Sequence, residues 1–272
     1  MQFTDSHCHL DFPELEQQLP TLINVCQQQG IHRIIVPSVE PNNWQKVLEL
    51  TDLTTSEFTV LAATGIHPWY IQPLDGNALD QLEQFVHQHQ HQLCAIGETG
   101  IDGTIAQQQD NLLQQKHFFE YQIDLANRYQ LPLIIHHRKS HLETVHHLKQ
   151  VKPDYGGVIH GFSGSYQQAK AYLDLGLKLG IGGTISYERA KKTINTVKRL
   201  PITSIVLETD APAMPLSGYQ GQANSPLRLI DIFTLLSNIR TEPAPELAKQ
   251  LELNIEELFT GCYSKSLSGE AT

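Results

Sequence analysis

Two histidines stand almost at the N-terminus, in the stretch "DSHCHLD", where His7 and His9 are one residue apart and Asp5 lies two residues before His7. Residues two apart in a strand point to the same face, so these three side chains are predicted to share one face and Cys8 to point to the other. Imidazoles and carboxylates on one face could bind a divalent metal. The chain has 14 histidines, however, and such a pair also arises by chance.

The ends of other apolar runs carry side chains of the same kinds. The run "LCAIGE" ends at Glu98, "LPLIIH" at His136, "GGVIH" at His160 and "SIVLETD" at Asp210. Hydrogen-bonded residues at strand ends explain one or two of them, but the whole set then needs several independent coincidences. The pattern therefore predicts a metal centre, as a site hypothesis. Its predicted ligands are His7, His9, Glu98, His136, His160 and Asp210.

Short apolar runs that alternate with segments of helical spacing would position these side chains. Near-continuous hydrophobicity is typical of strands covered on both faces, as in a parallel sheet. Helical spacing is found in 76–91, 107–130 and 165–175, with Ser165 expected as an N-cap. The expected strands are 2–7, 31–38, 58–65, 93–98, 131–136, 156–160, 177–182 and 204–210.

Strand followed by helix, repeated along the chain, predicts a TIM (β/α)8 barrel whose parallel strands carry the active site at their C-terminal ends. The competing fold is a doubly wound open sheet, but its glycine-rich dinucleotide turn is missing, since the first strand runs into "HCHL". No linker-like tract divides the chain, so residues 1–272 are expected to form a single domain.

Composition limits the classes of partner. The formal net charge of −10 argues against broad adhesion to nucleic acid or an anionic membrane, so an anionic substrate would need locally placed cations. The chain shows neither a signal peptide nor an apolar stretch of about 20 residues, which predicts a cytoplasmic protein that does not enter membranes. No obligate protein partner is evident. The cysteines are far apart and are expected to be buried thiols: Cys8, Cys26, Cys94 and Cys262.

The ligand types also indicate the metal. Imidazole and carboxylate without thiolate suit Zn²⁺ or Mn²⁺, and Mg²⁺ less well because it prefers oxygen. Six protein ligands exceed what one catalytic zinc usually takes. We therefore expect two divalent ions, with Glu98 as the bridge.

Four further residues are candidates for substrate binding. Ser163 and Gly164 form a turn before a predicted helix, whose N-terminal N–H groups favour an anion, although a simple N-cap is the alternative. Arg138 could bind a phosphate oxygen or instead pair with a carboxylate such as Asp102. His67, in "GIHPW", ends the third strand at the same rim, although the residues after it could form only a structured turn.

Other polar residues receive structural interpretations. Glu208 shares the strand parity of Asp210 and is expected to hydrogen-bond a ligand histidine from deeper in the barrel. The histidines of "HQHQHQ" (87–92) are expected on a solvated surface, and those between 137 and 147 outside the metal centre.

Taken together, the motifs "DSHCHLD", "GIHPW", "AIGETGID", "LPLIIHHR", "VIHGFSGS" and "LETDAP" resemble the TatD family of metal-dependent hydrolases over nearly the whole chain. The resemblance implies a TIM barrel with a divalent-metal centre on the same six residues. It also implies hydrolysis of phosphodiesters, several members being deoxyribonucleases that trim DNA ends, so DNA ends or a small phosphodiester are the expected substrates. Two departures, Gly103 in place of an aromatic residue and no basic residue in "GYQGQANSP", weaken the grip on long DNA more than the case for hydrolysis.

The expected mechanism is metal-assisted hydrolysis, with Asp210 as general base, assisted by Glu98, and Arg138 helping to stabilise charge on the phosphate oxygens. The same binuclear centre could instead hydrolyse a small amide, ester or lactone. A non-catalytic metal-binding barrel is the third alternative, disfavoured because an open, carboxylate-rich site suits exchangeable water.

Overall fold

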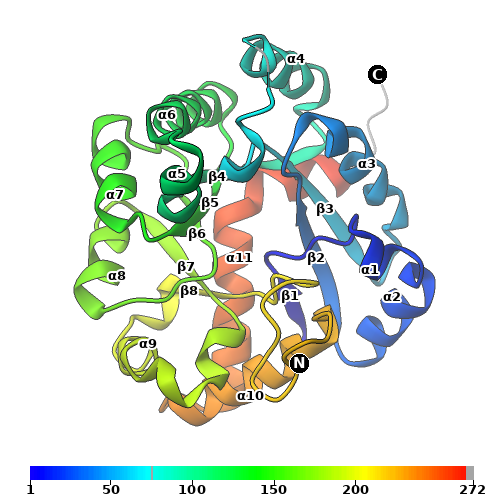
Figure 1. The fold of residues 1–272 in the computed structure, drawn as a ribbon. Coiled ribbons are helices and arrows are strands. Elements are labelled where there is room, and N and C mark those ends of the chain that lie inside the picture. The colour runs from blue at the N-terminus through cyan, green and yellow to red at the C-terminus, as the bar shows by residue number, and fades with distance from the viewer. Residues whose placement is uncertain (75, 268–272) are drawn as a thin grey trace.

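The structure, a computed structural model, describes residues 1–74 and 76–267. Eight parallel strands follow one another around a single sheet in chain order, with helices outside them (Figure 1). The predicted TIM barrel is therefore confirmed. The strands are β1 (Phe3–Asp5), β2 (Ile31–Pro37), β3 (Thr59–Thr64), β4 (Leu93–Asp102), β5 (Leu133–Arg138), β6 (Gly157–Ile159), β7 (Leu177–Ile181) and β8 (Ile205–Leu207).

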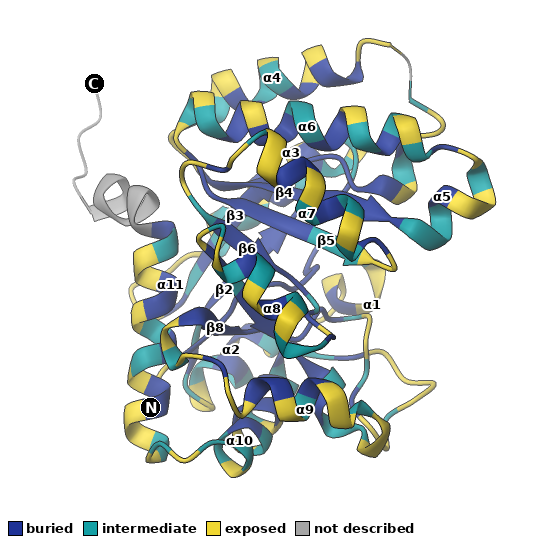
Figure 2. Ribbon diagram, turned by 90° about the vertical axis from the view of Figure 1, so that its left-hand side faces the viewer, coloured by how far each residue is buried: buried dark blue, intermediate teal, exposed yellow. Residues whose placement is uncertain are grey.

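Helices lie between the strands and cover the barrel. Figure 2 shows the strands in the colour of buried residues, enclosed by helices whose outward surfaces are exposed. The α-helices are α1 (Pro13–Glu16), α2 (Leu19–Gln28), α3 (Trp44–Glu49), α4 (Ala78–His89), α5 (Gly103–Gln109), α6 (Leu112–Tyr129), α7 (His141–Gln150), α8 (Tyr166–Leu173), α9 (Lys191–Val197), α10 (Leu229–Ile239) and α11 (Ala244–Leu267). Short 3₁₀ helices are η1 (Pro41–Asn43), η2 (Leu50–Leu53), η3 (Pro68–Tyr70), η4 (Gly183–Ser186), η5 (Glu188–Ala190), η6 (Ile202–Ser204) and η7 (Pro226–Arg228).

Two of the three predicted helices are single helices, and one is not. Ser165 caps α8, and its side chain and that of Gln168 bond reciprocally to each other's backbone N–H groups, which confirms the expected N-cap. The segment 107–130, predicted as one helix, is divided into α5 and α6 because Asp110 adopts a left-handed conformation with φ 51°. Helical spacing of apolar residues does not reveal such a break.

Several strand ends differ from the prediction, and β4 and β5 continue past their predicted ends at 98 and 136 to Asp102 and Arg138. β1 and β8 stop at Asp5 and Leu207, before the predicted ends at 7 and 210. Past these ends, the backbone N–H of Ser6 donates to Leu207 O at 2.9 Å and that of Asp210 donates to His7 O at 2.8 Å. These bonds and a parallel bridge between Cys8 and Ala211 join the first and last strands. The barrel therefore closes along the segments that carry three predicted ligands.

The barrel interior has its own apolar cluster, closed at one end by α11. Inward-facing residues of six strands pack against Ile255 and Phe259 of that helix: Ile35, Ala63, Ala95, Ile134, Val158 and Val206. Glu252 of α11 accepts from Thr4 at the start of the barrel, and Asn254 donates to Ile205 O at the start of β8. Figure 1 shows α11 crossing the barrel. Because α11 covers the N-terminal ends of the strands, the opposite, C-terminal ends are left for a site.

Within residues 1–74 and 76–267, no helix is both long and apolar enough to cross a membrane. Cys8, Cys26 and Cys94 are buried thiols, as predicted, whereas the side chain of Cys262 lies outside the described residues.

Candidate metal centre

Glycines on both sides of Glu98 allow β4 to approach β5 closely. Gly97 has φ 147°, and a Cβ there would lie 2.5 Å from Ile134 O; a Cβ on Gly100 would lie 2.0 Å from His136 O. The register between β4 and β5 shifts across this stretch, between Ile96 and Thr99. The resulting irregularity turns the buried Glu98 carboxylate toward the centre of the barrel mouth.

One oxygen of Glu98 faces the N-terminal histidines. Glu98 Oε2 lies 3.2 Å from His7 Nε2 and 3.6 Å from His9 Nε2. Asp210 Oδ1 lies 3.5 Å and 3.7 Å from the same two nitrogen atoms. Asp210, with φ 56°, occupies the left-handed region that aspartate tolerates better than most residues. Two carboxylates and two imidazoles thus surround one point.

The other oxygen of Glu98 faces a second group of imidazoles. Glu98 Oε1 lies 3.0 Å from His160 Nε2 and 3.1 Å from His136 Nδ1, and these two nitrogens are 3.3 Å apart. His67 Nε2 also lies 3.3 Å from Glu98 Oε1. The structure therefore brings all six predicted ligands together around Glu98, with His67 beside them.

The donor set fits metal ions. Two ligand atoms bound to one tetrahedral zinc at about 2.1 Å lie about 3.4 Å apart, close to the separations between facing atoms here. Three groups of side chains place ligand atoms within 4.8 Å of one another, and Glu98 belongs to two of them: His7, His160 and Asp210; His7, His9 and Glu98; His67, Glu98 and His136. The arrangement around both Glu98 oxygens is what a bridging carboxylate requires.

His67 is better suited to donate a hydrogen bond than to bind a metal. Its Nδ1 accepts from the backbone N–H of Trp69 at 3.1 Å, so the ring proton belongs on Nε2, which points at Glu98 Oε1. Burial lowers the pKa of His67 to about 4, so the ring is neutral. His67, expected to contact substrate, thus contacts the proposed bridge and also lines the pocket described below.

The electrostatics separate the two carboxylates of the centre. Burial raises the pKa of Asp210, only partly opposed by His160 and His9. Burial raises the pKa of Glu98 as well, but the surrounding imidazoles, among them the Nε2–H of neutral His67 and the ring of His160, hold that pKa well below its usual range. The pKa of His160 is lowered by burial but raised further by Glu98, Asp210 and Glu208, to about 10. Glu98 is therefore the persistent anion and Asp210 the more basic carboxylate.

Carboxylates behind the centre orient it. Asp102 Oδ2 accepts from His136 Nε2 at 3.1 Å and from Trp69 Nε1 at 2.7 Å, which leaves the His136 Nδ1 lone pair facing Glu98. The Asp5 carboxylate accepts hydrogen bonds from the backbone N–H and the hydroxyl of Thr209 and from the backbone N–H of His7, so its oxygens are used outside the group around Glu98.

Glu208 lies deeper, as expected. It accepts from Gly161 N, and its Oε1 lies 3.9 Å from His160 Nδ1. That distance is longer than a hydrogen bond, so the expected hydrogen bond to a predicted ligand histidine is not formed and the contact is electrostatic.

A cavity of about 1550 Å³ opens over the centre and includes every predicted substrate-binding residue. Arg138 is exposed there and does not pair with Asp102, whose partners are His136 and Trp69. Ser163 is exposed, whereas the N–H of Gly164 donates to Thr193 Oγ1 at 3.2 Å. The N–H groups expected to receive an anion are thus partly used within the protein.

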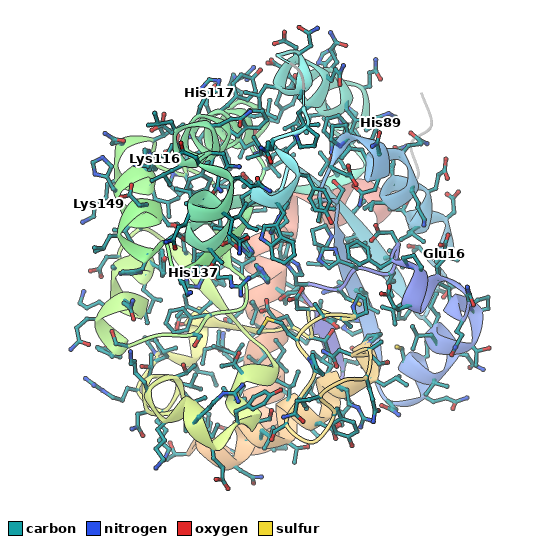
Figure 3. All side chains as sticks on the ribbon, in the orientation of Figure 1. Glu16, His89, Lys116, His117, His137 and Lys149 are labelled. Carbon is teal, nitrogen blue, oxygen red and sulfur yellow. The ribbon has the colours of Figure 1, made fainter. Side chains whose placement is uncertain are left out.

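Other histidines lie where the sequence indicated. His137 also lines the cavity without facing Glu98, and Figure 3 shows it near the middle of the barrel mouth, with His89, His117 and Lys149 on the outer helices. His87 and His91 are exposed.

Sequence reasoning missed several residues of the site. The sequence suggests Asp102 only as a partner of Arg138, although "GETGID" places it on the same strand as Glu98. The cavity is also lined by Lys139, Arg189 and Lys192, which carry no motif. Only the folded barrel brings the loops after β5 and β7 to one opening.

A sequence model described as TatD-related DNase matches residues 4–260. The chain belongs to the TatD family. It is 40% identical to YjjV of Escherichia coli strain K12, an uncharacterized metal-dependent hydrolase, over 258 residues that cover 95% of this chain and 98% of the relative. An uncharacterized metal-dependent hydrolase of Haemophilus influenzae is also 40% identical over 255 residues, covering 92% and 96% of the two chains.

Solved structures agree with this membership of the TatD family. The crystal structure of Escherichia coli YjjV, a TatD homologue, superposes with a TM-score of 0.88 over 95% of this chain and 98% of that one, at 40% identity. An organophosphorus hydrolase from Deinococcus radiodurans has a TM-score of 0.67 at 13% identity, covering 94% of this chain and 92% of that one, and shares the fold.

Proposed function

We propose that this metal-dependent hydrolase of the TatD family cleaves phosphodiester bonds at the ends of DNA strands. One observation carries the choice of an anionic substrate. The cavity over the centre is lined by four exposed cations, although the chain as a whole has a net charge of −10: Arg138, Lys139, Arg189 and Lys192. Outside the centre, the one acidic residue among the described lining residues is Glu143, which pairs with Lys116 at 2.6 Å.

The distribution of charge suits a phosphodiester better than a neutral amide or lactone. No salt bridge joins any of these four cations to a carboxylate in the described part of the chain, and Arg189 stacks over Tyr187 at 4.4 Å. Cations without carboxylate partners beside a site raise the local concentration of anions and neutralise phosphate oxygens. A neutral ester or amide would gain nothing from them.

Two divalent ions would be held on either side of Glu98. His7, His9 and Asp210 would hold one, and His136 and His160 the other. When bound, such ions lower the pKa of water and offset charge on phosphoryl oxygens. Their identity among Zn²⁺, Mn²⁺ and Mg²⁺ is left to the assay below.

The residues of the chain then divide the remaining work. Asp210 accepts the proton of the attacking water, because burial makes its carboxylate the more basic of the two in the centre. Glu98 stays ionised and positions the imidazoles on both sides. Arg138 binds a phosphate oxygen at the exposed side of the cavity, where a guanidinium can donate two hydrogen bonds.

The test is release of mononucleotides from short single-stranded DNA, with chelator and with added Mg²⁺, Mn²⁺ or Zn²⁺, for the wild type and Asp210→Asn. We expect metal-dependent release that the variant lowers by at least about 100-fold, the scale of general-base catalysis. A parallel panel of small amides, esters and lactones serves as the comparison. Turnover of that panel without release from DNA would overturn the proposal.

A further inference from the structure

Part of the exposed apolar surface of the protein lies at the mouth of the cavity. Of the seven large apolar side chains that are exposed in the described part of the chain, four lie elsewhere. Three exposed ones line the cavity: Trp69 is 45% exposed, Leu142 81% and Met214 39%. A cavity that combines exposed apolar surface with cations fits a ligand that has both flat apolar parts and anionic groups.

Trp69 differs from Leu142 and Met214 because hydrogen bonds hold its side chain in one orientation. Its indole N–H donates to Asp102 Oδ2 at 2.7 Å, and its backbone N–H donates to His67 Nδ1 at 3.1 Å. The indole also packs against the His67 ring in an edge-to-face arrangement, with centroids 5.5 Å apart and planes at 80°. An aromatic ring that is half exposed and anchored at its polar edge offers its face at little entropic cost on binding.

The anchor places Trp69 in a defined position relative to the metal centre. Asp102 Oδ2 accepts from both Trp69 and His136, whose Nδ1 lies 3.1 Å from Glu98 Oε1. The indole of Trp69 and the predicted ligand His136 are therefore hydrogen-bonded to the same oxygen, Asp102 Oδ2. A group stacked on this ring would lie near the predicted metal centre rather than at a remote part of the surface.

We propose that Trp69 is a stacking platform for the nucleobase adjacent to the scissile phosphate, which rests on the proposed function of the same site. The platform favours an unpaired base, because a base inside a duplex already has stacked neighbours on both faces and a paired base at a duplex end has only one free face. Arg138 and Lys192, which line the same cavity, are placed to take the neighbouring phosphates. Trp69 thus selects single-stranded ends without reading their sequence, since every base has a π-face.

Binding without turnover tests this directly. The chain has two tryptophans, and the second, Trp44, is only 5% exposed, with its Nε1 donating to Gly65 O at 2.8 Å. Titration of metal-supplemented Asp210→Asn protein with short oligothymidylate should quench the exposed Trp69 fluorescence. An abasic oligomer of equal length, with the same phosphates, should bind about 5- to 150-fold more weakly, equivalent to roughly 1–3 kcal/mol per stacked base, and should not quench.

Variants separate stacking from the hydrogen bond to Asp102. Trp69→Leu should bind oligothymidylate and the abasic oligomer equally, as measured by anisotropy of a labelled oligomer. Trp69→Phe keeps a ring but loses the indole N–H, and should retain part of the preference for bases. The matched control is Tyr155→Ala, which removes an aromatic residue that is 43% exposed and does not line the cavity, and should leave the preference intact.

The outcomes distinguish this proposal from the function on which it rests. Quenching and base preference without hydrolysis of DNA would support the stacking platform and count against the nuclease. DNA hydrolysis with equal affinity for base-bearing and abasic oligomers, or an undiminished preference in Trp69→Leu, would overturn the platform alone. Oligouridylate in a parallel titration identifies whether RNA supplies the base as well, and quenching by either oligomer supports the subsite.

Discussion

Replacement of Asp102 by Asn tests how the metal centre is oriented. Asp102 Oδ1 accepts from the N–H groups of Thr104 and Ile105 at the start of α5, and Oδ2 accepts from Trp69 and His136. Asn caps helices as well as Asp does, so its amide oxygen can remain on the α5 side. Its NH₂ group then faces two donors. His136 Nε2 can accept from this amide only if the ring proton moves to Nδ1. Nδ1 then has no lone pair to offer on the side that faces Glu98.

The expected loss is roughly 10- to 100-fold in metal affinity or activity, the usual effect of removing a hydrogen-bond partner of a ligand histidine, or about 1.4–2.7 kcal/mol. The assay is isothermal titration of the metal-free protein with Zn²⁺ or Mn²⁺, together with kcat/KM on a small phosphodiester. Asp110→Asn is the matched control, because it makes the same change at an exposed residue of the neighbouring loop. Metal affinity and kcat/KM within twofold of the wild type in Asp102→Asn would refute the reasoning.

Two other changes have defined outcomes. Gly97→Ala combines an unfavourable φ of 147° with a Cβ 2.5 Å from Ile134 O, so we expect a loss of about 1–3 kcal/mol in the free energy of unfolding and a displacement of Glu98. Denaturant titration measures the first effect and metal binding the second. Gly76→Ala, with nothing within 4 Å of its Cβ, is the control and should change neither. Metal removal should lower Tm, and the difference in Tm should grow as pH rises from about 6.5 to about 10. In the metal-free protein the raised pKa of His160 means that its contact with Glu98 stabilises the fold fully below 6.5, and this stabilisation is lost as pH rises through 10. Metal binding needs the deprotonated His160 ring, so the metal-bound protein does not lose stability in this way. A Tm difference that shrinks over this range would contradict the assignment of His160.

The sequence identified the barrel and the residues that meet at its mouth because both depend on local patterns. Each buried strand is an apolar run, and the polar residue at its end is visible as a change in that run. The residues at which the strands end could not be predicted from the sequence. β1 and β8 stop early because His7, His9 and Asp210 must leave regular pairing to face Glu98, and β4 continues to Asp102 through a shifted register. Alternation of side chains does not reveal a bulge.

Contacts between distant loops were also beyond the sequence. Trp69 follows β3 and Asp102 ends β4, and their hydrogen bond joins residues 33 positions apart. The tautomer of His67 depends on a backbone N–H two residues later, a consequence of the turn and not of residue type. Such features need the relative placement of the strands, which periodicity does not supply.

The seam between the first and last strands has a consequence for how the protein matures during synthesis. Asp5 and Thr209, which join across this seam, are 204 positions apart, so the ribosome makes the first two histidines long before it makes Asp210. A chain arrested before residue 210 lacks the carboxylate proposed to accept the proton, and its open barrel has unpaired strand edges. Domains fold as units as they emerge, so the six predicted ligands come together only after nearly the whole chain has been made. The nascent polypeptide, which is synthesised beside messenger RNA, therefore carries no assembled hydrolytic centre.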